Sequence, residues 1–341
     1  MNKGTPIRAT APTLEAVAAV AGVSRATVSR VVNGSTEVTA AVTARVQDAI
    51  KQLDYVPNRA ARSLANNKTM AIAFVVPENA ATFFSDPFFA ALISGVVHAL
   101  EHSDYVLNLQ LAKAQSPSSK TAKYLLGGNV DGALVASHHS GDEFLTQLSA
   151  VMPVVFGGRP PVMSKAVSAF VDVDNVDGAS KGTSYLIAKG RRRIGCISGP
   201  EDMAATADRT RGWRDALSAN GLADDLITPG DFTQESGELA MAELLLMDSK
   251  LDAVFVQNDL MALGAIRTLQ RNGIRVPEDV SIMGFDDSPA ATSGPIALTT
   301  VRQPSFELGE QMAETLLRIL SGEEARPMVL METSVVVRES A

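Results

Sequence analysis

The chain has 341 residues, of which 46% are hydrophobic, 20% charged and 5% aromatic, which is a globular composition with an aliphatic bias and excludes a disordered chain. The single cysteine, Cys196, excludes a disulfide framework and argues against a cysteine-based metal site. No segment reaches the roughly eighteen uncharged apolar residues of a membrane span. Because residues 1–12 contain no apolar run of signal-peptide length, a cytoplasmic protein without membrane contact is expected.

The net charge of -8 is unevenly distributed along the chain. Residues 1–68 contain nine basic and four acidic side chains, a net charge of +5, so the remainder carries -13. A small basic module attached to a large acidic body indicates a polyanionic partner for the first part alone, unless the charges cluster by chance.

The first elements in chain order are two short helices. Apolar residues recur at helical spacing from Leu14 to Ala21, directly after the capping residue Thr13. Gly22 ends this helix and Ser24 begins the next one within three residues. This arrangement predicts a helix-turn-helix.

The second helix has two different faces. Its inward face is formed by Val28, Val31 and Val32, and its outward face by Arg25, Ala26, Ser29, Arg30 and Asn33. Arginine can bind guanine in the major groove, a small apolar side chain can contact a thymine methyl, and hydroxyls and amides can reach phosphates. The outward face therefore suits DNA, although a solvated helix face would look similar.

A third amphipathic helix is expected from about Thr39 to Leu53, so that three helices enclose a small core. Pro57 stops it, and Asn58 can cap a further short, alanine-rich helix in the linker, which contains the unsupported leucine Leu64.

Four ordered motifs in this region resemble the LacI/GalR family of lactose and galactose repressors. They are Thr-Leu-x-x-Val-Ala (13–18), Ala-Gly-Val-Ser (21–24), Thr-Val-Ser-Arg-Val-Val-Asn-Gly (27–34) and Tyr-Val-Pro-Asn-x-x-Ala-Arg-Ser-Leu (55–64). The resemblance implies that Arg25, Ala26, Ser29 and Arg30 read the major groove. It also implies that residues 58–65 become helical on operator DNA, with Leu64 of each subunit wedged into the minor groove to kink the duplex. The full set of DNA contacts implied is Ser24, Arg25, Ala26, Thr27, Ser29, Arg30, Asn33, Tyr55, Asn58, Arg59, Ala61 and Leu64.

From Met70 onward, apolar runs alternate with helical segments. Strands are expected at 71–76, 105–109, 131–135, 153–156, 193–197, 251–256 and 280–284, with a last strand at 328–338; helices are expected at 88–101, 175–189, 208–220 and 259–272. This alternation predicts an α/β fold with two doubly wound parallel sheets. Ligands are expected at the carboxyl ends of the strands.

The resemblance extends over nearly the whole chain, through segments such as Asp86-Pro-Phe-Phe, Val171-Asp-Val-Asp-Asn and Leu298-Thr-Thr-Val-Arg-Gln-Pro. It implies a two-lobed periplasmic-binding-protein-like body behind the headpiece. The expected domains are a helix-turn-helix headpiece at 1–57, a hinge at 58–69, a first lobe at 70–171 plus 302–325, and a second lobe at 172–299 plus 326–338. The chain would cross between the lobes near residues 172, 299 and 326.

The effector site implied by the resemblance lies between the lobes. Its residues are Phe88, Ser137, His138, Arg159, Arg209, Phe232, Asn258 and Asp286. Arginine and carboxylate side chains can bind paired hydroxyls, and an aromatic ring can stack on the apolar face of a sugar. Alternatively, Asn258 and Asp286 could be helix caps and Phe88 a core residue. Where the lactose repressor has polar sugar contacts this chain has Ala136 and Gly157, so galactosides are not implied.

These observations predict a ligand-responsive transcriptional regulator without a cofactor, most simply a repressor of sugar-utilisation genes that a small carbohydrate releases from a palindromic operator. A plant-derived oligosaccharide or glucoside is one hypothesis for that carbohydrate; a nucleoside or purine effector, or a corepressor, is the alternative. A periplasmic sugar-binding protein would lack residues 13–64, and an enzyme on the same fold is disfavoured because no phosphate loop, HExxH or Gly-x-Ser-x-Gly motif is present. No leucine heptad follows the last expected strand, so a homodimer is expected rather than a tetramer.

Overall fold

The computed structural model describes residues 12–32, 35, 37–56, 68–112, 119–160 and 168–341. It divides into two compact units, Met1–Thr69 and Met70–Ala341. The boundary falls where the linker was expected to end. Among the residues described, no helix combines the length and the apolar run that crossing a bilayer requires.

The first unit contains three helices: α1 (Leu14–Ala21), α2 (Arg25–Val32) and α3 (Ala40–Gln52). Thr13 caps α1 by accepting a hydrogen bond from the Ala16 amide, and Gly22 ends it in the left-handed conformation. The Ser24 hydroxyl accepts from the Thr27 amide at 3.1 Å, as expected of the residue that begins α2. Val28 is fully buried against α1 and α3, whereas Val31 and Val32 are half-buried at the edge of this core.

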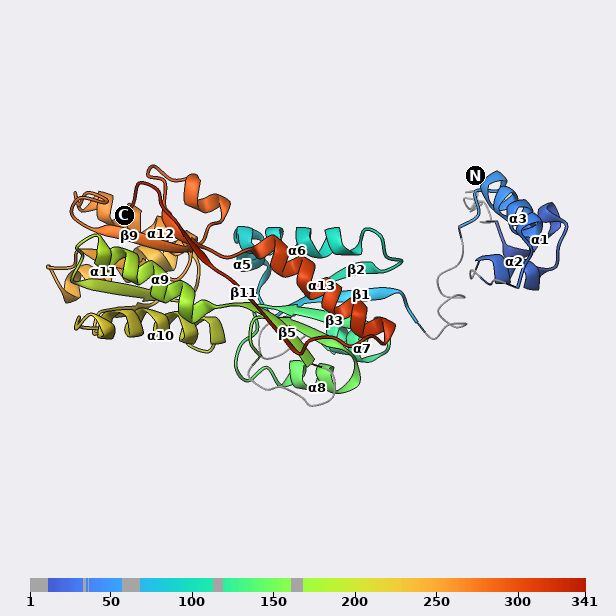
Figure 1. The fold of residues 1–341 in the computed structure, drawn as a ribbon, viewed down its shortest axis with the longest axis horizontal. Coiled ribbons are helices and arrows are strands. Elements are labelled where there is room, and N and C mark those ends of the chain that lie inside the picture. Colours follow the sequence, from blue (N-terminus) through green and yellow to red (C-terminus); the bar gives the residue numbers. More distant parts are fainter. Residues whose placement is uncertain (1–11, 33–34, 36, 57–67, 113–118, 161–167) are drawn as a thin grey trace, which may run out of the picture. The chain divides into compact units, whose positions relative to one another are not determined.

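The second unit contains two six-stranded sheets, each with helices on both faces (Figure 1). The first sheet has the order β11-β5-β4-β3-β1-β2, and its pairings are parallel. Its strands are β1 (Ala71–Val76), β2 (Val106–Leu111), β3 (Gly132–Ala136), β4 (Val154–Gly157), β5 (Ser168–Val173) and β11 (Met328–Met331). The helices of this lobe are α5 (Ala80–Ser85), α6 (Pro87–Leu100), α7 (Ser119–Leu126), α8 (Glu143–Val151) and α13 (Ser305–Ser321). Helices α6 and α13 cover one face, and α7 and α8 pack on the other.

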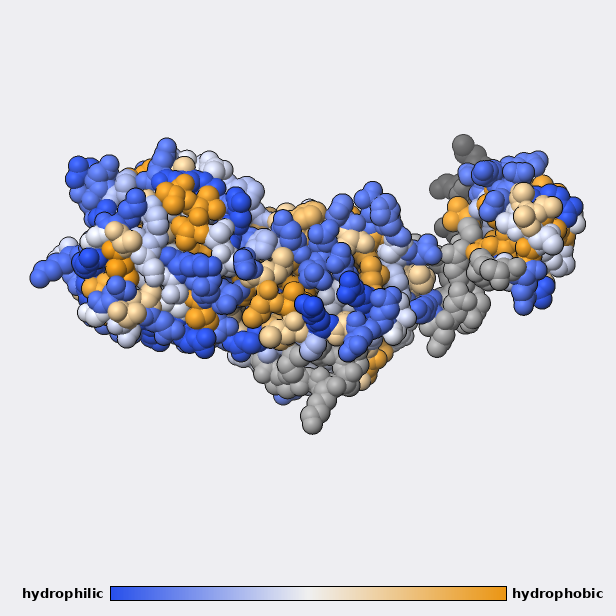
Figure 2. Space-filling model, in the orientation of Figure 1, coloured by the Kyte–Doolittle hydropathy of each residue, from blue (hydrophilic) through white to orange (hydrophobic). Residues whose placement is uncertain are grey.

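The second sheet has the order β12-β10-β9-β8-β6-β7, with β12 antiparallel to β10. Its strands are β6 (Ile194–Ser198), β7 (Ile227–Pro229), β8 (Ala253–Val256), β9 (Ser281–Asp286), β10 (Thr299–Arg302) and β12 (Ser334–Val336). The helices are α9 (Asn175–Ala188), α10 (Ala204–Ala219), α11 (Gln234–Met247), α12 (Asp259–Arg271) and the 3-10 turn η1 (Pro289–Thr292). Helices α9 and α10 cover one face and α11 and α12 the other. Hydrophilic side chains cover most of the face seen in Figure 2, with smaller apolar areas between them.

The crossings between the lobes lie later in the chain than expected. The first sheet ends at Val173, and α9 of the second lobe begins at Asn175; β10 keeps residues 299–302 in the second sheet. The assignment of 326–338 to the second lobe is wrong in its first part, because β11 pairs with β5 in the first sheet. The expected single strand at 328–338 is therefore two strands in two sheets, and the terminal segment runs from one lobe to the other (Figure 1).

Candidate functional site

The exposed face of α2 presents the side chains expected to read DNA. Ser24, Arg25, Ala26 and Arg30 are exposed, while Thr27 and Ser29 are half-buried beside them. The Ser24 and Thr27 hydroxyls share a hydrogen bond of 2.9 Å, which fixes the first turn of the helix. The sequence therefore folds so that two arginines and an alanine project from a helix held in place by Val28.

Both arginines on this face have acidic partners within the headpiece. Arg25 Nε lies 3.2 Å from a Glu15 carboxylate oxygen, and Arg30 Nε lies 3.9 Å from one of Glu37. All four side chains are more than half exposed, so these pairs contribute little to stability. The guanidinium groups can therefore exchange these partners for bases or phosphates at small cost.

One of the expected DNA contacts lies elsewhere in the headpiece. Tyr55 is only 7% exposed, and its ring packs in the core with Val17 and Val46. Tyr55 is therefore a core residue of the headpiece and does not belong to the exposed surface that α2 presents. The remaining expected contacts, Asn33, Asn58, Arg59, Ala61 and Leu64, lie outside the described residues.

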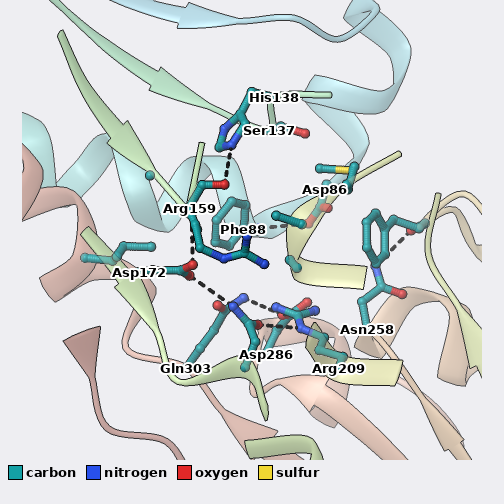
Figure 3. Close-up of a pocket in the computed structure, with 18 of the residues that line it drawn as sticks. Asp86, Phe88, Ser137, His138, Arg159, Asp172, Arg209, Asn258, Asp286 and Gln303 are labelled. Atoms are coloured by element: carbon teal, nitrogen blue, oxygen red, sulfur yellow. Dashed lines mark hydrogen bonds and ion pairs between the residues drawn. The ribbon is translucent and has the colours of Figure 1, made fainter. Parts of the chain in front are cut away.

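The eight residues expected to bind an effector come together in one cleft between the lobes of the second unit. Phe88, Ser137, His138 and Arg159 line it from the first lobe, and Arg209, Phe232, Asn258 and Asp286 from the second. The cleft contains about 750 Å³ of space not filled by protein atoms, part of it open to solvent. As expected for parallel sheets, these side chains come from loops and helix starts at the carboxyl ends of strands (Figure 3).

Arg209 is the positive group at the floor of the cleft. It projects from α10, is 6% exposed, and its guanidinium carbon lies 3.7 Å from the centre of the Phe285 ring. Nε donates to Asn175 Oδ1 at 2.8 Å, and Nη1 donates to the Gln257 carbonyl at 2.6 Å and lies 3.9 Å from Asp286 Oδ1. Burial lowers the pKa of Arg209 from its ordinary value. These contacts hold the guanidinium plane fixed before any ligand arrives.

Three carboxyl groups that line the cleft act electrostatically on this arginine: Asp286 and Asp172, which are buried, and Asp86, which is partly buried (Figure 3). Burial raises the pKa of Asp86 and of Asp172 to about 6, and raises that of Asp286 well above its ordinary value despite the nearby Arg209. Asp286 Oδ1 accepts from Gln303 Nε2 at 2.5 Å, and Asp172 Oδ2 accepts from the Arg159 amide at 2.9 Å. The floor of the cleft is therefore rich in hydrogen-bond acceptors and has a single cation.

Asn258 and Phe232 form a pair on the second-lobe wall. Asn258 Oδ1 accepts from the Met261 amide and caps α12, so the cap considered from the sequence is present, yet the residue also lines the cleft. Its Nδ2 donates to the Phe232 carbonyl at 2.9 Å. Phe232 has a backbone φ of +67°, an uncommon conformation for a residue with a side chain. The helix cap thus also fixes the loop that directs this ring.

The first-lobe wall carries His138 and Ser137. Because the Arg159 carbonyl is an acceptor only, the 3.0 Å contact from His138 Nε2 requires that nitrogen to carry the proton. Burial lowers the pKa of His138, so the ring is neutral and Nδ1 bears the lone pair. The Ser137 hydroxyl donates to Glu78 Oε1 at 2.8 Å.

Arg159 connects the two lobes. It follows β4 of the first lobe, and its Nη2 donates to both carboxylate oxygens of Asp208 on α10, at 3.0 and 2.9 Å. Its backbone binds His138 and Asp172, so one residue connects the two walls and the floor.

Four further polar residues line the cleft that the sequence did not assign to it: Asp86, Asp172, Asn175 and Gln303. Each lies within or beside a segment that carries the family resemblance, Asp86-Pro-Phe-Phe, Val171-Asp-Val-Asp-Asn and Leu298-Thr-Thr-Val-Arg-Gln-Pro. The contacts of these four residues involve side chains from other strands. The segments that carry the resemblance therefore indicated where the site lies but did not show which atoms meet in it.

Comparison with known proteins follows the same two-part division. Residues 13–58 match the family model of bacterial regulatory proteins of the lacI family, and residues 183–341 match a periplasmic binding protein-like domain. The transcriptional regulator CelR of Thermobifida fusca is 44% identical over 333 residues, covering 96% of this chain and 98% of CelR. The transcriptional repressor CytR of Escherichia coli K12 is 33% identical over 337 residues, covering 97% and 96%.

The chain belongs to the LacI family of bacterial regulatory proteins.

Solved structures of LacI-family regulators share the whole architecture. A complex of the transcriptional regulator CelR with cellobiose has a TM-score of 0.75 and 42% identity, covering 97% of this chain and all of that one. The lac repressor dimer bound to operator and the anti-inducer ONPF has a TM-score of 0.82 and 26% identity, covering 96% and 98%. The relatives named here are transcriptional regulators and repressors.

In this LacI-family cleft, Gly199 sets the position of Phe232. A Cβ at residue 199 would lie 2.1 Å from Phe232 Cζ and 2.5 Å from its Cε1. Gly199→Ala must therefore displace the ring, and we expect ligand affinity to fall roughly fivefold to tenfold, equivalent to about 1 kcal/mol. Calorimetry on a double-mutant cycle checks this. In a Phe232→Ala background Gly199→Ala should have a smaller effect, because only the contact with Thr206 Oγ1, 2.7 Å from such a Cβ, remains. A fully additive loss would contradict the contact with Phe232.

Asp86 should lower stability above about pH 6. Its pKa of about 6 in the fold exceeds the ordinary 3.8, so the folded protein binds an extra proton between these values and loses stability as pH rises through them. Asp86→Asn keeps the Oδ1 acceptor that caps α6. We expect it to stabilise the protein by on the order of 1 kcal/mol at pH 7 and to leave it unchanged near pH 4. Equal melting temperatures at pH 7 would contradict the raised pKa.

Proposed function

We propose that this protein is a homodimeric, cytoplasmic repressor of carbohydrate-utilisation genes. In this proposal α2 reads a palindromic operator, and a neutral disaccharide of the cellobiose class binds in the cleft and releases the DNA. The observation that carries the proposal is the joint placement of Arg209, Asp286, Phe88 and Phe232 around one cavity. The 44% identity to CelR, and the cellobiose in a solved CelR complex, support the choice of sugar.

The charges in the cleft favour a neutral ligand. Three carboxyl groups line the cleft together with two arginines, and both arginines already have partners: Arg209 donates to Asn175 and the Gln257 carbonyl, and Arg159 is paired with Asp208. A phosphate or carboxylate on the ligand would therefore face Asp86, Asp172 and Asp286 without a free cation to neutralise it. Sugar hydroxyls both donate and accept, so they can bind the carboxyl groups and the arginine together.

Release of DNA follows from differential binding. A sugar that contacts both lobes favours the lobe arrangement in which Arg159 reaches Asp208. If operator DNA favours a different arrangement, sugar and DNA weaken each other by the same factor.

Calorimetry on the full chain tests the choice of ligand. Cellobiose should bind, and cellobiose 6-phosphate should bind at least about tenfold more weakly, a difference of about 1.4 kcal/mol. Cytidine and hypoxanthine represent the nucleoside and purine alternative, and neither should bind. If one of them binds and no disaccharide does, the sugar proposal is wrong while the DNA-binding proposal stands.

A further inference from the structure

A second connection between the lobes lies beside the sugar cleft and involves three residues: Glu78, His139 and Asp202. Glu78 follows β1 and His139 follows β3, both in the first lobe, whereas Asp202 follows β6 in the second lobe. His139 Nε2 lies 3.1 Å from Glu78 Oε1, and its Nδ1 lies 2.9 Å from Asp202 Oδ1. The side chains of His139 and Glu78 are only 12% and 16% exposed. We call this set the histidine bridge.

The geometry of the histidine bridge sets the protonation of the ring. An ionised carboxylate can only accept hydrogen bonds, so both imidazole nitrogens must donate. His139 is therefore the doubly protonated imidazolium, in contrast to the neutral His138 beside it. The hydrogen bond to Glu78, followed by that to Asp202, raises the pKa of His139 to about 9 although burial opposes it.

Backbone hydrogen bonds fix the positions of the residues in the histidine bridge. The Ser140 amide donates to the Asp202 carbonyl at 2.7 Å, a second contact from the first lobe to the second. The His139 amide donates to Asp142 Oδ2 at 3.2 Å. Glu78 also accepts from Ser137, whose side chain lines the sugar cleft, so the bridge and the ligand wall share a carboxylate.

We propose that His139 is a positioning residue for the effector, which holds Asp202 so that the two lobes close around the ligand, and that this closure takes up a proton. The inference rests on the proposed function, because it assigns the regulation of the same cleft. Arg159 and Asp208 form a further ion pair across the cleft, but this pair contains no imidazole, the side chain whose charge changes closest to neutral pH.

The direction of the pH effect follows from linkage. Opening the lobes removes Asp202 from the ring, so the pKa of His139 is higher when the lobes are closed than when they are open. The contribution of His139 to closure is complete below its open-state pKa and is lost as pH rises through about 9. The charged groups that face His139 are Glu78, Asp142 and Asp202, and the adjacent His138 is neutral.

Nitrogen NMR of the imidazole rings tests the bridge without any ligand. The chain has four histidines, and single His→Gln variants assign each ring. We expect both His139 nitrogens to stay protonated up to about pH 9. Loss of a proton from the His139 ring near pH 6.5, the pKa of histidine in a model peptide, would overturn the proposal.

Calorimetry with cellobiose tests the coupling to the effector. In the wild type, cellobiose affinity should decline between pH 7 and 9 as His139 loses its proton. Asp202→Asn removes the charge at constant shape, and we expect about a tenfold loss of affinity at pH 7 and no such decline. Asp224→Asn is the matched control, because Asp224 lies in the same lobe and forms an exposed pair with Arg214. Unchanged affinity and pH profile in Asp202→Asn would overturn the proposal. If the wild type binds no cellobiose, the proposed function fails, and the NMR titration alone decides the protonated bridge.

Discussion

Replacing Arg209 with alanine is expected to abolish the response to sugar while leaving operator binding intact. The substitution removes the single cation among Asp86, Asp172 and Asp286 and leaves the Gln257 carbonyl without its donor. Truncating a buried, hydrogen-bonded charged group in a binding site costs about 3 kcal/mol of binding free energy, which corresponds to roughly 100-fold in sugar affinity. The measurement is calorimetry with cellobiose, beside anisotropy of labelled operator.

The control for this prediction is on the same helix. Arg211→Ala removes an exposed guanidinium from α10 two residues away, and it should bind sugar as the wild type does. Arg209→Lys retains the charge but lacks the planar fork, so it should recover only part of the affinity. Because a buried arginine also supports the fold, melting temperatures must show that each variant is folded. Full sugar affinity in a folded Arg209→Ala variant would place the ligand elsewhere.

Arg30→Ala should weaken operator binding by about 1–3 kcal/mol and have a smaller effect on random DNA. Arg30 lies on the exposed face of α2, and its pair with Glu37 is long and exposed, so its removal should barely change stability. The loss on specific DNA exceeds the loss on random DNA because a guanidinium can bind two acceptors of one guanine. Anisotropy with an operator recovered by in vitro selection, and with a scrambled duplex, measures both values.

The comparison variant for Arg30 is Arg45→Ala. Arg45 is an exposed arginine of α3 in the same headpiece, so its removal changes the net charge equally. It should lower the affinity for operator and scrambled duplex alike. If Arg30→Ala also lowers both affinities to the same extent, Arg30 contacts phosphate and does not read a base.

The local signals in the headpiece predicted its structure well. Thr13, Gly22 and Ser24 mark helix ends through caps and a left-handed turn, which depend on residues a few positions apart. The burial of Tyr55 was missed because it depends on packing against Val17 and Val46, and no neighbouring residue indicates it.

The terminal strands show the limit of prediction from the sequence. Residues 328–336 contain two apolar runs separated by Glu332, Thr333 and Ser334. The expectation of one strand overlooked this break, and nothing local shows that β11 pairs with β5 and β12 with β10. Strands β5, β7 and β10 were not predicted as strands; two of them have only three or four residues and contain threonine or proline. Their strand structure comes from the neighbours they pair with.

The candidate site was predicted in its residue types more fully than in its contacts. All eight expected side chains line the cleft, but the carboxyl groups of Asp86 and Asp172 reach Arg209 only because two lobes meet. The histidine bridge could not be predicted for the same reason, because Glu78, His139 and Asp202 lie in the loops that follow three different strands, β1, β3 and β6. A pattern along one chain segment cannot show contacts of this kind.

Release of operator by cellobiose is the most direct test of the account. Full-length protein bound to its selected, fluorescently labelled operator is titrated with cellobiose at pH 7, and anisotropy reports the bound fraction. The account predicts that cellobiose releases the wild type, fails to release Arg209→Ala, and releases Arg211→Ala as it does the wild type. Retention of the wild type on operator at cellobiose concentrations that saturate the cleft by calorimetry would contradict it.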